Sequence, residues 1–588
     1  MSINSKHFLN TPETLVVDSL EGLANINPKL SLDKQNKILH IAKPDRSKVA
    51  IICGGGSGHE PAHAGFVGDG MLTAAVAGTV FASPNSSQVR RGIDIVDNDK
   101  GTLIIVKNYT GDVLNFGLAK EQYAALRPDK ADKVKFITVG DDVAVTRSQG
   151  KIVGRRGLAG TVLVYKIAGA LAQKGLSLDE IYNVSQYAAN RVASIGVGLE
   201  HCHVPGTAAT TSHLSADEIE IGMGIHNESG VKRLKPAPAL SELLPQLLDL
   251  LTSTSDPERS FVPFKGNDEV VLLVNNLGGV SELELGAVVA EARRQLDKRG
   301  LKALRVLAGT YMTSLNMPGF SITLLLLPTA GEKDAPSKET ILSALDAKAD
   351  VPGWKWSSAS PAPEQVAFTP AAAAQTQKPT GSPIKASDPS GFTAGIKRAC
   401  EALIAAEPKI TEMDNIAGDG DCGLTLKAGA EGVLAKISSG AITGDNIVQS
   451  VIAIAQVAEE AMGGTSGALY SIFFSGLARG IQSSSGTATP EDWARALTFA
   501  LQNLYTYTRA RPPSRTLVDP LDAFVTPLSK STDFPTAVKA AAEAADKTKD
   551  LAAKAGRAAY VEGDRLKEEK IPDPGAWGVK TVLEAIFN

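Results

Sequence analysis

Val49-Ala50-Ile51-Ile52-Cys53 runs directly into Gly54-Gly55-Gly56-Ser57-Gly58-His59. The first five residues are continuously apolar and rich in β-branched side chains, which predicts a strand buried on both faces. The glycines that follow predict a tight turn out of that strand. In sheets of buried strands, ligands bind at the carboxyl ends of the strands, so a histidine in this turn marks a candidate site.

Three more segments before residue 355 have the same form. They are Thr102-Leu103-Ile104-Ile105-Val106, Val134-Lys135-Phe136-Ile137-Thr138-Val139 and Val270-Val271-Leu272-Leu273-Val274. Helical patterns separate these runs. Continuous apolar strands that alternate with helices predict a parallel sheet covered on both faces, and therefore an α/β fold for this part of the chain.

The chain has 588 residues, too many for one core. Residues 356–390 are rich in Pro, Ala, Ser, Thr and Gln and predict a flexible linker between a region 1–355 and a region 391–588. After the linker, apolar residues from Val451 to Met462 recur at helical spacing. Thr489-Pro490-Glu491-Asp492 is typical of a helix start, and the Ala- and Lys-rich stretch 537–560 lacks proline. We expect the second region to be all-α.

Composition excludes several classes of function. A net charge of −4, a pI near 6.1 and only 5% aromatic residues argue against a nucleic-acid or acidic-membrane partner. The four cysteines form no CxxC pair, which favours reduced thiols. The N-terminus lacks the apolar run of a signal peptide, and no stretch is long and apolar enough for a membrane span. We expect a cytoplasmic protein.

The second region contains an acidic, glycine-punctuated stretch, Asp414-Asn415-Ile416-Ala417-Gly418-Asp419-Gly420-Asp421. All eight histidines of the chain lie at or before His226, so no imidazole accompanies these carboxylates. An all-oxygen ligand set suits Mg²⁺ rather than Zn²⁺. The spacing excludes an EF-hand, because the later ligands and the closing Glu of that loop are absent. We therefore predict a magnesium site formed by Asp414, Asp419 and Asp421.

Two other stretches of the first region carry candidate catalytic side chains. Asn108-Tyr109-Thr110-Gly111-Asp112 follows a predicted strand, so Asp112 is either a general base or a turn aspartate. In Glu220-Ile221-Gly222-Met223-Gly224-Ile225-His226-Asn227-Glu228, a strand would place two glycines and His226 on one face, and the alternative is a partly exposed histidine at a strand end. The glycine-rich turn before His59 fits neither a dinucleotide fingerprint, nor a P-loop, nor a nucleophile elbow.

His201-Cys202-His203, with His213 downstream, invites comparison with a zinc site, but the required loop spacings are absent and we do not predict one. In the second region, Cys422-Gly423-Leu424-Thr425 is expected to open a helix whose N–H groups can hold phosphate. Gly463-Gly464-Thr465-Ser466-Gly467 offers a second such helix start. Arg515-Thr516 and Asp573-Pro574-Gly575 are further candidates for anion or nucleotide contacts.

Taken together, these stretches resemble the dihydroxyacetone kinase family, specifically its single-chain, ATP-dependent members. The resemblance extends to Met71-Leu72-Thr73-Ala74-Ala75-Val76, Val80-Phe81-Ala82-Ser83-Pro84, Asn275-Asn276-Leu277-Gly278-Gly279 and Thr313-Ser314-Leu315-Asn316-Met317-Pro318-Gly319. It covers nearly the whole chain. It implies a substrate domain of α/β type in two subdomains and a nucleotide domain built as a barrel of antiparallel helices.

The resemblance also implies roles for particular residues. His226 matches the histidine that binds the substrate's carbonyl carbon as a hemiaminal. Gly56, Ser57, Gly58, His59, Lys107 and Asp112 match the other substrate contacts, and Asp414, Asp419 and Asp421 match the magnesium ligands. The residues expected to bind ATP are Cys422, Gly423, Leu424, Thr425, Thr465, Ser466, Arg515, Thr516, Asp573, Pro574 and Gly575. One departure is the run Ala510-Arg511-Pro512-Pro513-Ser514, where many relatives are richer in glycine.

The activity implied is ATP-dependent phosphorylation of dihydroxyacetone, and of D-glyceraldehyde, with ATP and Mg²⁺ as cofactors. We hypothesise that Asp112 accepts the proton of the substrate hydroxyl and that His59 assists as acid or base. The alternatives are cyclisation of FAD at the nucleotide site, a non-catalytic triose sensor, and phosphate transfer from a phosphocarrier protein. The resemblance further implies a homodimer, in which one subunit's nucleotide domain can serve the other's substrate domain.

Overall fold

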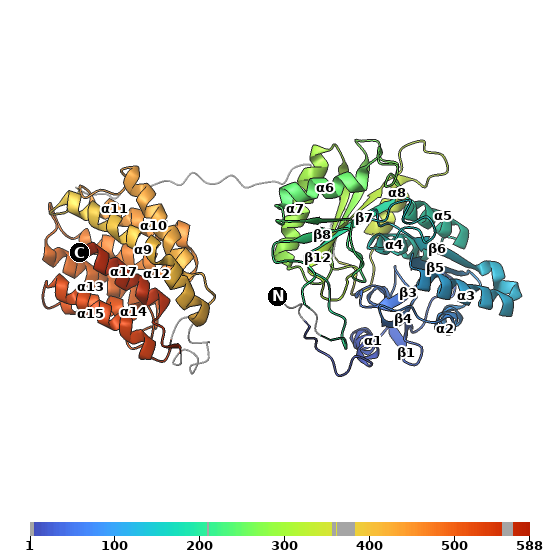
Figure 1. Cartoon of the computed structure of the whole chain (residues 1–588), viewed down its shortest axis with the longest axis horizontal. Coiled ribbons are helices and arrows are strands. Elements are labelled where there is room, and N and C mark those ends of the chain that lie inside the picture. The colour runs from blue at the N-terminus through green and yellow to red at the C-terminus, as the bar shows by residue number, and fades with distance from the viewer. Residues whose placement is uncertain (1–4, 209–210, 356–359, 362–382, 555–568, 588) are drawn as a thin grey trace. The chain divides into compact units, whose positions relative to one another are not determined.

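The computed structural model describes residues 5–208, 211–355, 360–361, 383–554 and 569–587. The chain forms two compact units, Met1–Phe368 and Thr369–Asn588 (Figure 1). The first unit is α/β and the second is helical, which confirms the predicted fold class. Most of the predicted linker, and the predicted helical residues 555–560, lie outside the described residues, so the boundaries 355, 356 and 391 stay predictions.

The strands are β1 (Leu30–Asp33), β2 (Ile38–Ile41), β3 (Ala50–Ser57), β4 (Ala74–Val80), β5 (Thr102–Lys107), β6 (Val134–Val139), β7 (Val192–Gly198), β8 (Ile219–Ile221), β9 (Lys232–Leu234), β10 (Glu269–Asn276), β11 (Lys302–Gly309) and β12 (Gly319–Leu326). The α-helices of the first unit are α1 (Leu15–Ile26), α2 (Ser86–Val96), α3 (Thr110–Leu126), α4 (Gly160–Gln173), α5 (Leu178–Ala189), α6 (Leu240–Thr252), α7 (Glu282–Lys298) and α8 (Lys338–Asp346). Those of the second unit are α9 (Pro389–Ala417), α10 (Cys422–Ser438), α11 (Ile447–Val457), α12 (Gly464–Ile481), α13 (Pro490–Tyr507), α14 (Val518–Leu528), α15 (Phe534–Lys547) and α17 (Pro574–Phe587).

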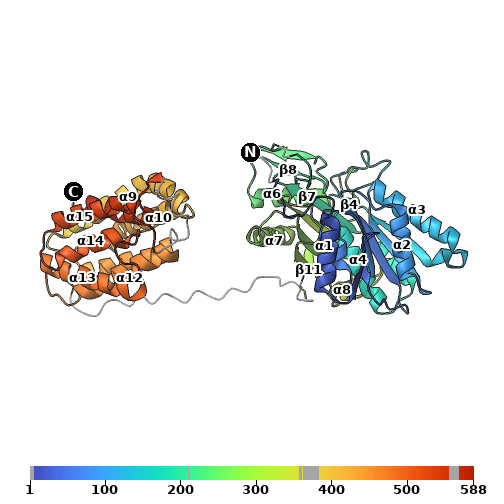
Figure 2. The ribbon, with the colours of Figure 1, turned by 90° about the horizontal axis from the view of Figure 1, so that it is seen from below.

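The first sheet has the order β1-β2-β4-β3-β5-β6, and β4, β3, β5 and β6 run parallel. Side chains alternate between its faces: Ala50 and Ile52 contact α2 and α3 on one side, and Ile51 and Cys53 contact α4 on the other. Each buried aliphatic side chain of this kind contributes about 1.5–3 kcal/mol of hydrophobic free energy. Figure 2 shows α2 and α3 beside each other on the outer face. The predicted strands that begin at residues 49, 102 and 134 are confirmed.

The second sheet has the order β11-β10-β12-β7-β8-β9, and its topology differs from the prediction. Only β10 and β11 pair in parallel, while β12, β7, β8 and β9 pair antiparallel. The strand predicted at residues 270–274 is present as β10. Its continuous apolarity arises because Val270 and Leu272 face α6 and α7 while Val271 and Leu273 face the central core. An unbroken apolar run therefore reports burial on both faces rather than strand direction.

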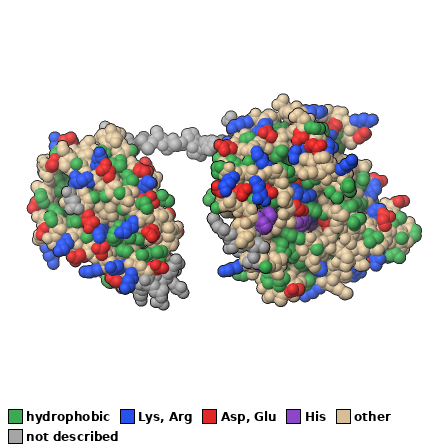
Figure 3. All heavy atoms as spheres, viewed as in Figure 1, with side chains coloured by type: hydrophobic (Ala, Val, Ile, Leu, Met, Phe, Trp, Pro, Cys, Tyr) green, Lys and Arg blue, Asp and Glu red, His purple; other side chains and the backbone are tan. Residues whose placement is uncertain are grey.

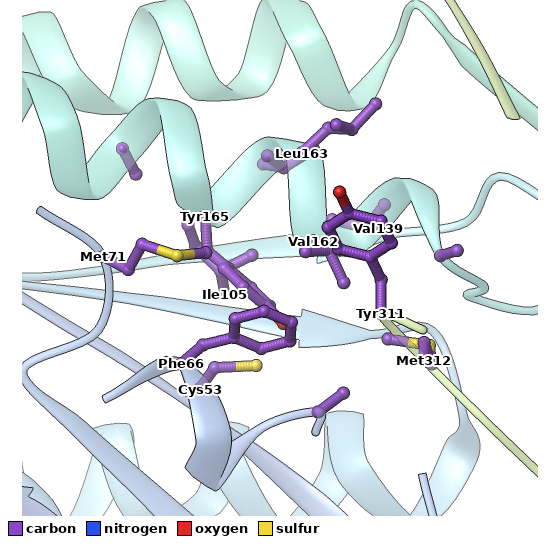
Figure 4. Packing of buried hydrophobic residues seen from close by; sticks show 14 of the residues in the cluster. Cys53, Phe66, Met71, Ile105, Val139, Val162, Leu163, Tyr165, Tyr311 and Met312 are labelled. Carbon is purple, nitrogen blue, oxygen red and sulfur yellow. The ribbon is translucent and has the colours of Figure 1, made fainter. Parts of the chain in front are cut away.

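A central core joins the two sheets (Figure 4). Tyr165 of α4 is fully buried, and its ring centroid lies 5.5 Å from that of Phe66. Tyr311, from the second sheet's side of the unit, belongs to the same cluster. Because one core supports both sheets, the loops that leave each sheet are held in a fixed relation to one another.

In the second unit, eight α-helices among the described residues close a ring in which each packs on the next, from α9 through α15 to α17 and back to α9. The predicted helix start at Thr489 is confirmed as the N-cap of α13, where Thr489 and Asp492 form a capping box. The ring encloses an apolar cavity of about 460 Å³. Helices of the described part of the chain are too short or too polar to cross a membrane.

Charged side chains of both signs are interspersed over the faces seen in Figure 3, and no large basic patch appears there. Histidine side chains are visible on the first unit in the same view. The mixed surface agrees with the low net charge of the chain.

Candidate active site

The carboxyl edge of the first sheet gathers the polar side chains predicted for the first unit. β3 leads into the glycine-rich turn and His59, and β5 leads into α3, whose first turn holds Asp112. The second sheet contributes from its own loops: His226 follows β8, and Thr313 follows β11. Residues from both halves of the unit therefore meet at one place.

His59 and His226 form the centre of this place. The Nε2 atoms of the two rings lie 3.0 Å apart. His59 is fully buried, and its Nδ1 lies 2.8 Å from the carbonyl oxygen of Thr313. A carbonyl only accepts, so Nδ1 of His59 is the donor and its Nε2 is left with a lone pair when the ring is neutral. Burial, followed by the positive charges of Lys107 and His226, lowers the pKa of His59 well below its usual value, so this ring is neutral.

Glu228 holds the opposite side of the His226 ring. Its Oε1 lies 3.2 Å from Nδ1 of His226, and its Oε2 accepts the backbone N–H of His226 at 2.8 Å. Burial alone would raise the pKa of Glu228, but the hydrogen bonds and charge of His226 and the charge of Arg156 lower it to about 2. An ionised carboxylate accepts, so Nδ1 of His226 carries a proton and Nε2 points at His59.

Two aromatic rings flank His226. Tyr109 stands edge-on to it at a centroid distance of 4.6 Å, and Phe81 does so at 4.9 Å. Phe81 also stacks on His59 at 5.3 Å. About 20% of the His226 side chain stays exposed, whereas His59 has no exposed surface. A small molecule from solvent therefore reaches His226 first.

Asp112 and Lys107 lie buried at the same edge. Asp112 accepts a hydrogen bond from the Ser83 hydroxyl. Burial raises the pKa of Asp112, against the charge of Lys107, and burial lowers the pKa of Lys107. A carboxylate whose pKa is raised toward neutrality is better matched to proton transfer than a solvated one. Asp112 is only 3% exposed and lies in the first turn of α3, so its role as a general base stays a prediction.

The glycines of the turn have a packing role. A Cβ on Gly58, whose φ is +104°, would lie 2.7 Å from the Phe81 ring, and one on Gly56 would lie 2.7 Å from the backbone nitrogen of Ala82. The hydroxyl of Ser57 donates to the carbonyl of Gly78. These contacts bring the segment after β4, with Phe81, against the histidines.

The strand considered for residues 220–228 is not formed as such. β8 ends at Ile221, and His226 lies in a turn closed by a hydrogen bond from Gly224 N–H to the Glu228 carbonyl. A Cβ on Gly224 would lie 2.1 Å from Oε2 of Glu228, so this glycine makes room for a carboxylate rather than for a ligand over the ring. The strand interpretation failed because glycine at 222, with φ of +81°, turns the chain.

The other histidines are engaged elsewhere. His203 Nδ1 lies 2.8 Å from Nε2 of His7, and His201 stacks on His213. The Cys202 thiol accepts a hydrogen bond from the Ser314 hydroxyl. Within the described part of the chain, the group of side chains able to hold a metal ion is the acidic one in the second unit.

That group is Asp414, Asp419 and Asp421, and a carboxylate oxygen from each lies within 4.8 Å of the others. Asp414, near the end of α9, is buried, and its Oδ2 accepts the backbone N–H of Cys422. The other two are exposed on the turn between α9 and α10. Three converging carboxylate oxygens, two of them open to solvent, fit Mg²⁺, which keeps several water ligands.

Several predicted nucleotide contacts surround the acidic group. Burial, then the charges of Asp414, Asp573, Asp421 and Asp419, raises the pKa of the Cys422 thiol to about 12. Burial also raises the pKa of Asp573 to about 6. The charges that act on Cys422 and on Asp573 include that of Asp414 in both cases, so these side chains lie near the acidic group. As predicted, Cys422 opens α10, so the residues Gly423, Leu424 and Thr425 form its first turn.

Arg515 borders the same cluster. Its side chain has no exposed surface, and its φ is +57°. One amino group donates to the Ile571 carbonyl, while Nε and the other amino group have no hydrogen-bond partner among the residues that the structure describes. Asp519 holds this strained turn, because its carboxylate accepts the backbone N–H groups of Ser514 and Thr516.

The remaining candidates lie at helix starts. Thr465 and Ser466 are in the first turn of α12, after two glycines with positive φ. Tyr470, one turn further along α12, packs in the same apolar cluster as Cys422, and burial, followed by the charges of Cys422 and Asp573, raises its pKa. This end of α12 therefore faces the acidic group. Pro574 and Gly575 begin α17, and Asp573 accepts the Ala576 N–H there.

Some functional side chains escaped the sequence reasoning. No sequence pattern assigned a role to four of them, Phe81, Ser83, Thr313 and Glu228. Their contacts join segments far apart in the chain, and no local pattern reports such contacts. For Glu228, the available signal was its position two residues after a histidine in a glycine-rich stretch.

The α/β unit with its paired histidines and the helical ring with its carboxylate cluster define a two-domain kinase. The chain matches the Dak1 domain over residues 21–353 and the DAK2 domain over residues 416–588. It belongs to the dihydroxyacetone kinase family.

Three relatives illustrate the match. The chain is 43% identical to a dihydroxyacetone kinase of Pichia angusta, over 99% of this chain and 98% of that protein. It is 38% identical to the triokinase/FMN cyclase of Homo sapiens, over 100% and 99%. The crystal structure of the dihydroxyacetone kinase from C. freundii in complex with AMP-PNP and Mg²⁺ superposes with a TM-score of 0.63 at 30% identity, covering 99% of each chain.

Proposed function

We propose that this protein phosphorylates dihydroxyacetone, and D-glyceraldehyde, with ATP and Mg²⁺, and that the triose is held as a hemiaminal on His226. The observation that carries the proposal is the 3.0 Å contact between Nε2 of the partly exposed His226 and Nε2 of the buried His59. This contact supports the proposal, because a nucleophile and its acid–base partner would have to lie together at the mouth of the site. The names of the relatives support the choice of substrate.

Capture of the ketone begins when His226 gives its Nε2 proton to His59. The freed lone pair of His226 then adds to the carbonyl carbon, the C=O π bond breaks, and the new alkoxide takes the proton from His59. One C–N bond and one O–H bond form, and His59 returns to its neutral state. A short triose is thereby fixed in one orientation, which in favourable cases is worth about 7–11 kcal/mol.

Transfer of phosphate follows from a terminal hydroxyl of the held triose. We assign Asp112 as the base that takes the proton of that hydroxyl, supported by its burial beside Ser83 and Lys107. The hydroxyl oxygen attacks the γ-phosphorus, and ADP leaves. Asp414, Asp419 and Asp421 would hold Mg²⁺, which would supply the charge neutralisation that phosphoryl transfer requires.

A coupled assay tests the proposal. With ATP and Mg²⁺, ADP release should accompany dihydroxyacetone and D-glyceraldehyde but not glycerol, since glycerol has no carbonyl to bind His226. Equal turnover of glycerol would contradict capture through a carbonyl. No turnover of any triose, with ATP binding intact, would favour the sensor alternative instead.

The human relative is named a triokinase/FMN cyclase, and we propose cyclisation of a flavin nucleotide, FAD, at the nucleotide site as a second activity. Incubation of the full chain with FAD and Mn²⁺, with product separation by chromatography, tests it. A His226→Ala variant should keep this activity if it exists, because the reaction needs the second unit alone.

We further propose a cytoplasmic homodimer whose subunits share domains. Mixing a His226→Ala variant with an Asp419→Asn variant should restore activity if one subunit's nucleotide domain serves the other's triose. No restoration would indicate that each chain works within itself.

A further inference from the structure

We infer that Glu228 is a positioning residue of the triose site: it keeps a proton on Nδ1 of His226, so that Nε2 is the nitrogen that reacts, and it pairs with the charge that the adduct leaves on the ring. This inference rests on the proposed capture of the triose by His226. It adds a residue for which the sequence suggested no role.

Both oxygens of Glu228 are committed to His226. Oε2 accepts the backbone N–H at 2.8 Å, and Oε1 lies 3.2 Å from Nδ1 of the ring. The two contacts fix the ring relative to its own backbone. Because the carboxylate can only accept, Nδ1 of His226 keeps its proton, and Nε2 is the nitrogen that exchanges a proton with His59.

The surroundings hold Glu228 in turn. Gly224 donates its N–H to the Glu228 carbonyl at 2.9 Å, and its missing side chain leaves the space that the carboxylate fills. Arg156 lies beside the same glycine and is fixed by Asp142, which is fully buried, and by the Gly222 carbonyl. The guanidinium thus contributes positive charge near Glu228 without forming a direct ion pair with it.

The positions of the protons fix the net charge of the pair formed by His59 and His226. His59 donates through Nδ1 to Thr313, and His226 donates through Nδ1 to Glu228. The 3.0 Å contact between the two Nε2 atoms is a hydrogen bond only if one further proton lies between them, which gives the histidine pair a charge of +1 opposite the −1 of Glu228.

Addition of the triose conserves this count. The shared proton moves through His59 to the ketone oxygen, which becomes a hydroxyl. Nε2 of His226 gains the bond to carbon while Nδ1 keeps its proton, so the ring is an N-alkyl imidazolium of charge +1, still opposite Glu228. No proton enters or leaves the site, and no charge is left unpaired in a buried place.

The plainer reading is that Glu228 only closes the turn by accepting the His226 N–H. The two readings differ in a property of the ring. A turn-closing residue does not set the tautomer of His226, whereas the inferred role does.

The variant Glu228→Gln tests the difference in the full-length protein. Glu228 serves the two N–H groups with separate oxygens, whereas an amide has one acceptor oxygen and no negative charge, so the contact to Nδ1 is weakened. Glu180→Gln is the matched control, because Glu180 also accepts a backbone N–H and a side-chain donor, both from Ser177, at the exposed start of α5.

The first measurement is ¹⁵N NMR of histidine-labelled enzyme without substrate, with the His226 signals identified by their loss in His226→Ala. We expect a protonated Nδ1 of His226 in wild type and in Glu180→Gln, where the second proton is shared between Nε2 of His226 and Nε2 of His59, and we expect Nδ1 to lose its proton in Glu228→Gln. An unchanged pattern in Glu228→Gln overturns the inference. This measurement needs no triose, so it decides the role of Glu228 even if the proposed function fails.

The second measurement follows [2-¹³C]dihydroxyacetone on the enzyme. Wild type should convert the carbonyl carbon signal to that of an sp³ carbon, and Glu228→Gln should retain less adduct and a kcat/KM for the triose lower by roughly tenfold or more. The KM for ATP should stay unchanged, and Glu228→Asp should recover part of the loss. Equal adduct in wild type and Glu228→Gln overturns the inference. Absence of adduct in wild type instead removes the covalent step of the proposed function.

Discussion

The Nε2 atoms of His59 and His226 lie 3.0 Å apart, although 167 positions separate the two residues in the chain. One comes from the turn after β3 in the first sheet and the other from the loop after β8 in the second. Their contact exists because a single core, with Tyr165 at its centre, fixes the two sheets against each other. The site therefore depends on the packing of the unit as much as on its own residues.

Replacement of His226 by alanine should lower kcat/KM for dihydroxyacetone by roughly 100-fold or more, since the triose would lose the covalent anchor that we propose. Steady-state kinetics with a coupled assay measures this. His213→Ala is a suitable control, because that ring stacks on His201 outside the site. Wild-type kcat/KM in His226→Ala would remove the anchor from the mechanism.

Gly58→Ala should raise the KM for the triose with a smaller effect on kcat. The new Cβ meets the Phe81 ring at 2.7 Å, and φ of +104° is strained for alanine, so the ring that flanks both histidines must move. Gly117→Ala on α3, where a Cβ meets nothing within 4 Å, is the matched control. Unchanged KM in Gly58→Ala would show that Phe81 does not shape the site.

Asp419→Asn should increase the free Mg²⁺ concentration needed for half-maximal activity by roughly tenfold or more, because one of three charged ligands is lost. Activity measured against free Mg²⁺ at saturating ATP shows the change. Asp546→Asn, which removes a carboxylate paired with Lys580 on the surface, should leave the Mg²⁺ requirement as in wild type. The same shift in both variants would argue against a specific metal ligand.

The strand before the glycine turn, the helix start at Thr489 and the acidic stretch were predictable from sequence because each is a local pattern. The antiparallel pairing of β12 and β7 was not, since double burial gives the same apolar run in either direction. The role of Glu228 was hidden for a different reason. It depends on the φ of Gly222 and on the space beside Gly224, which appear only once the turn is folded.

Asp519→Asn should weaken ATP binding while the KM for the triose stays unchanged. The carboxylate accepts two backbone N–H groups around Arg515, and an amide oxygen replaces only one of its two acceptors. Loss of one such hydrogen bond costs about 1–3 kcal/mol, so the strained turn relaxes and the Arg515 guanidinium moves away from the acidic group.

Calorimetric titration with an ATP analogue measures the affinity. Asp522→Asn, on the same helix but bonded to Tyr505, provides the comparison. Equal affinities in Asp519→Asn and wild type would place Arg515 outside the nucleotide site.

Lys166→Met should stabilise the first unit near neutral pH. Lys166 has no exposed surface, donates to the Ala344 carbonyl and faces the Trp354 ring, and burial lowers its pKa to about 8. Because the folded pKa lies below the unfolded value, the folded state is favoured when the amine is neutral. The stability of the folded state is therefore highest above the unfolded pKa, and it is lost as the pH falls through about 8, at a cost of up to roughly 3 kcal/mol.

Methionine fills a similar volume without a charge. The gain in free energy of unfolding over wild type should therefore be largest near pH 6 and should shrink toward about pH 10. Chemical unfolding followed by near-ultraviolet circular dichroism at both pH values measures the difference, and Lys174→Met, which alters an exposed amine at the C-cap of α4, controls for the loss of charge alone. A gain that stays the same at both pH values would show that the buried ammonium is not what limits the stability of the wild-type unit.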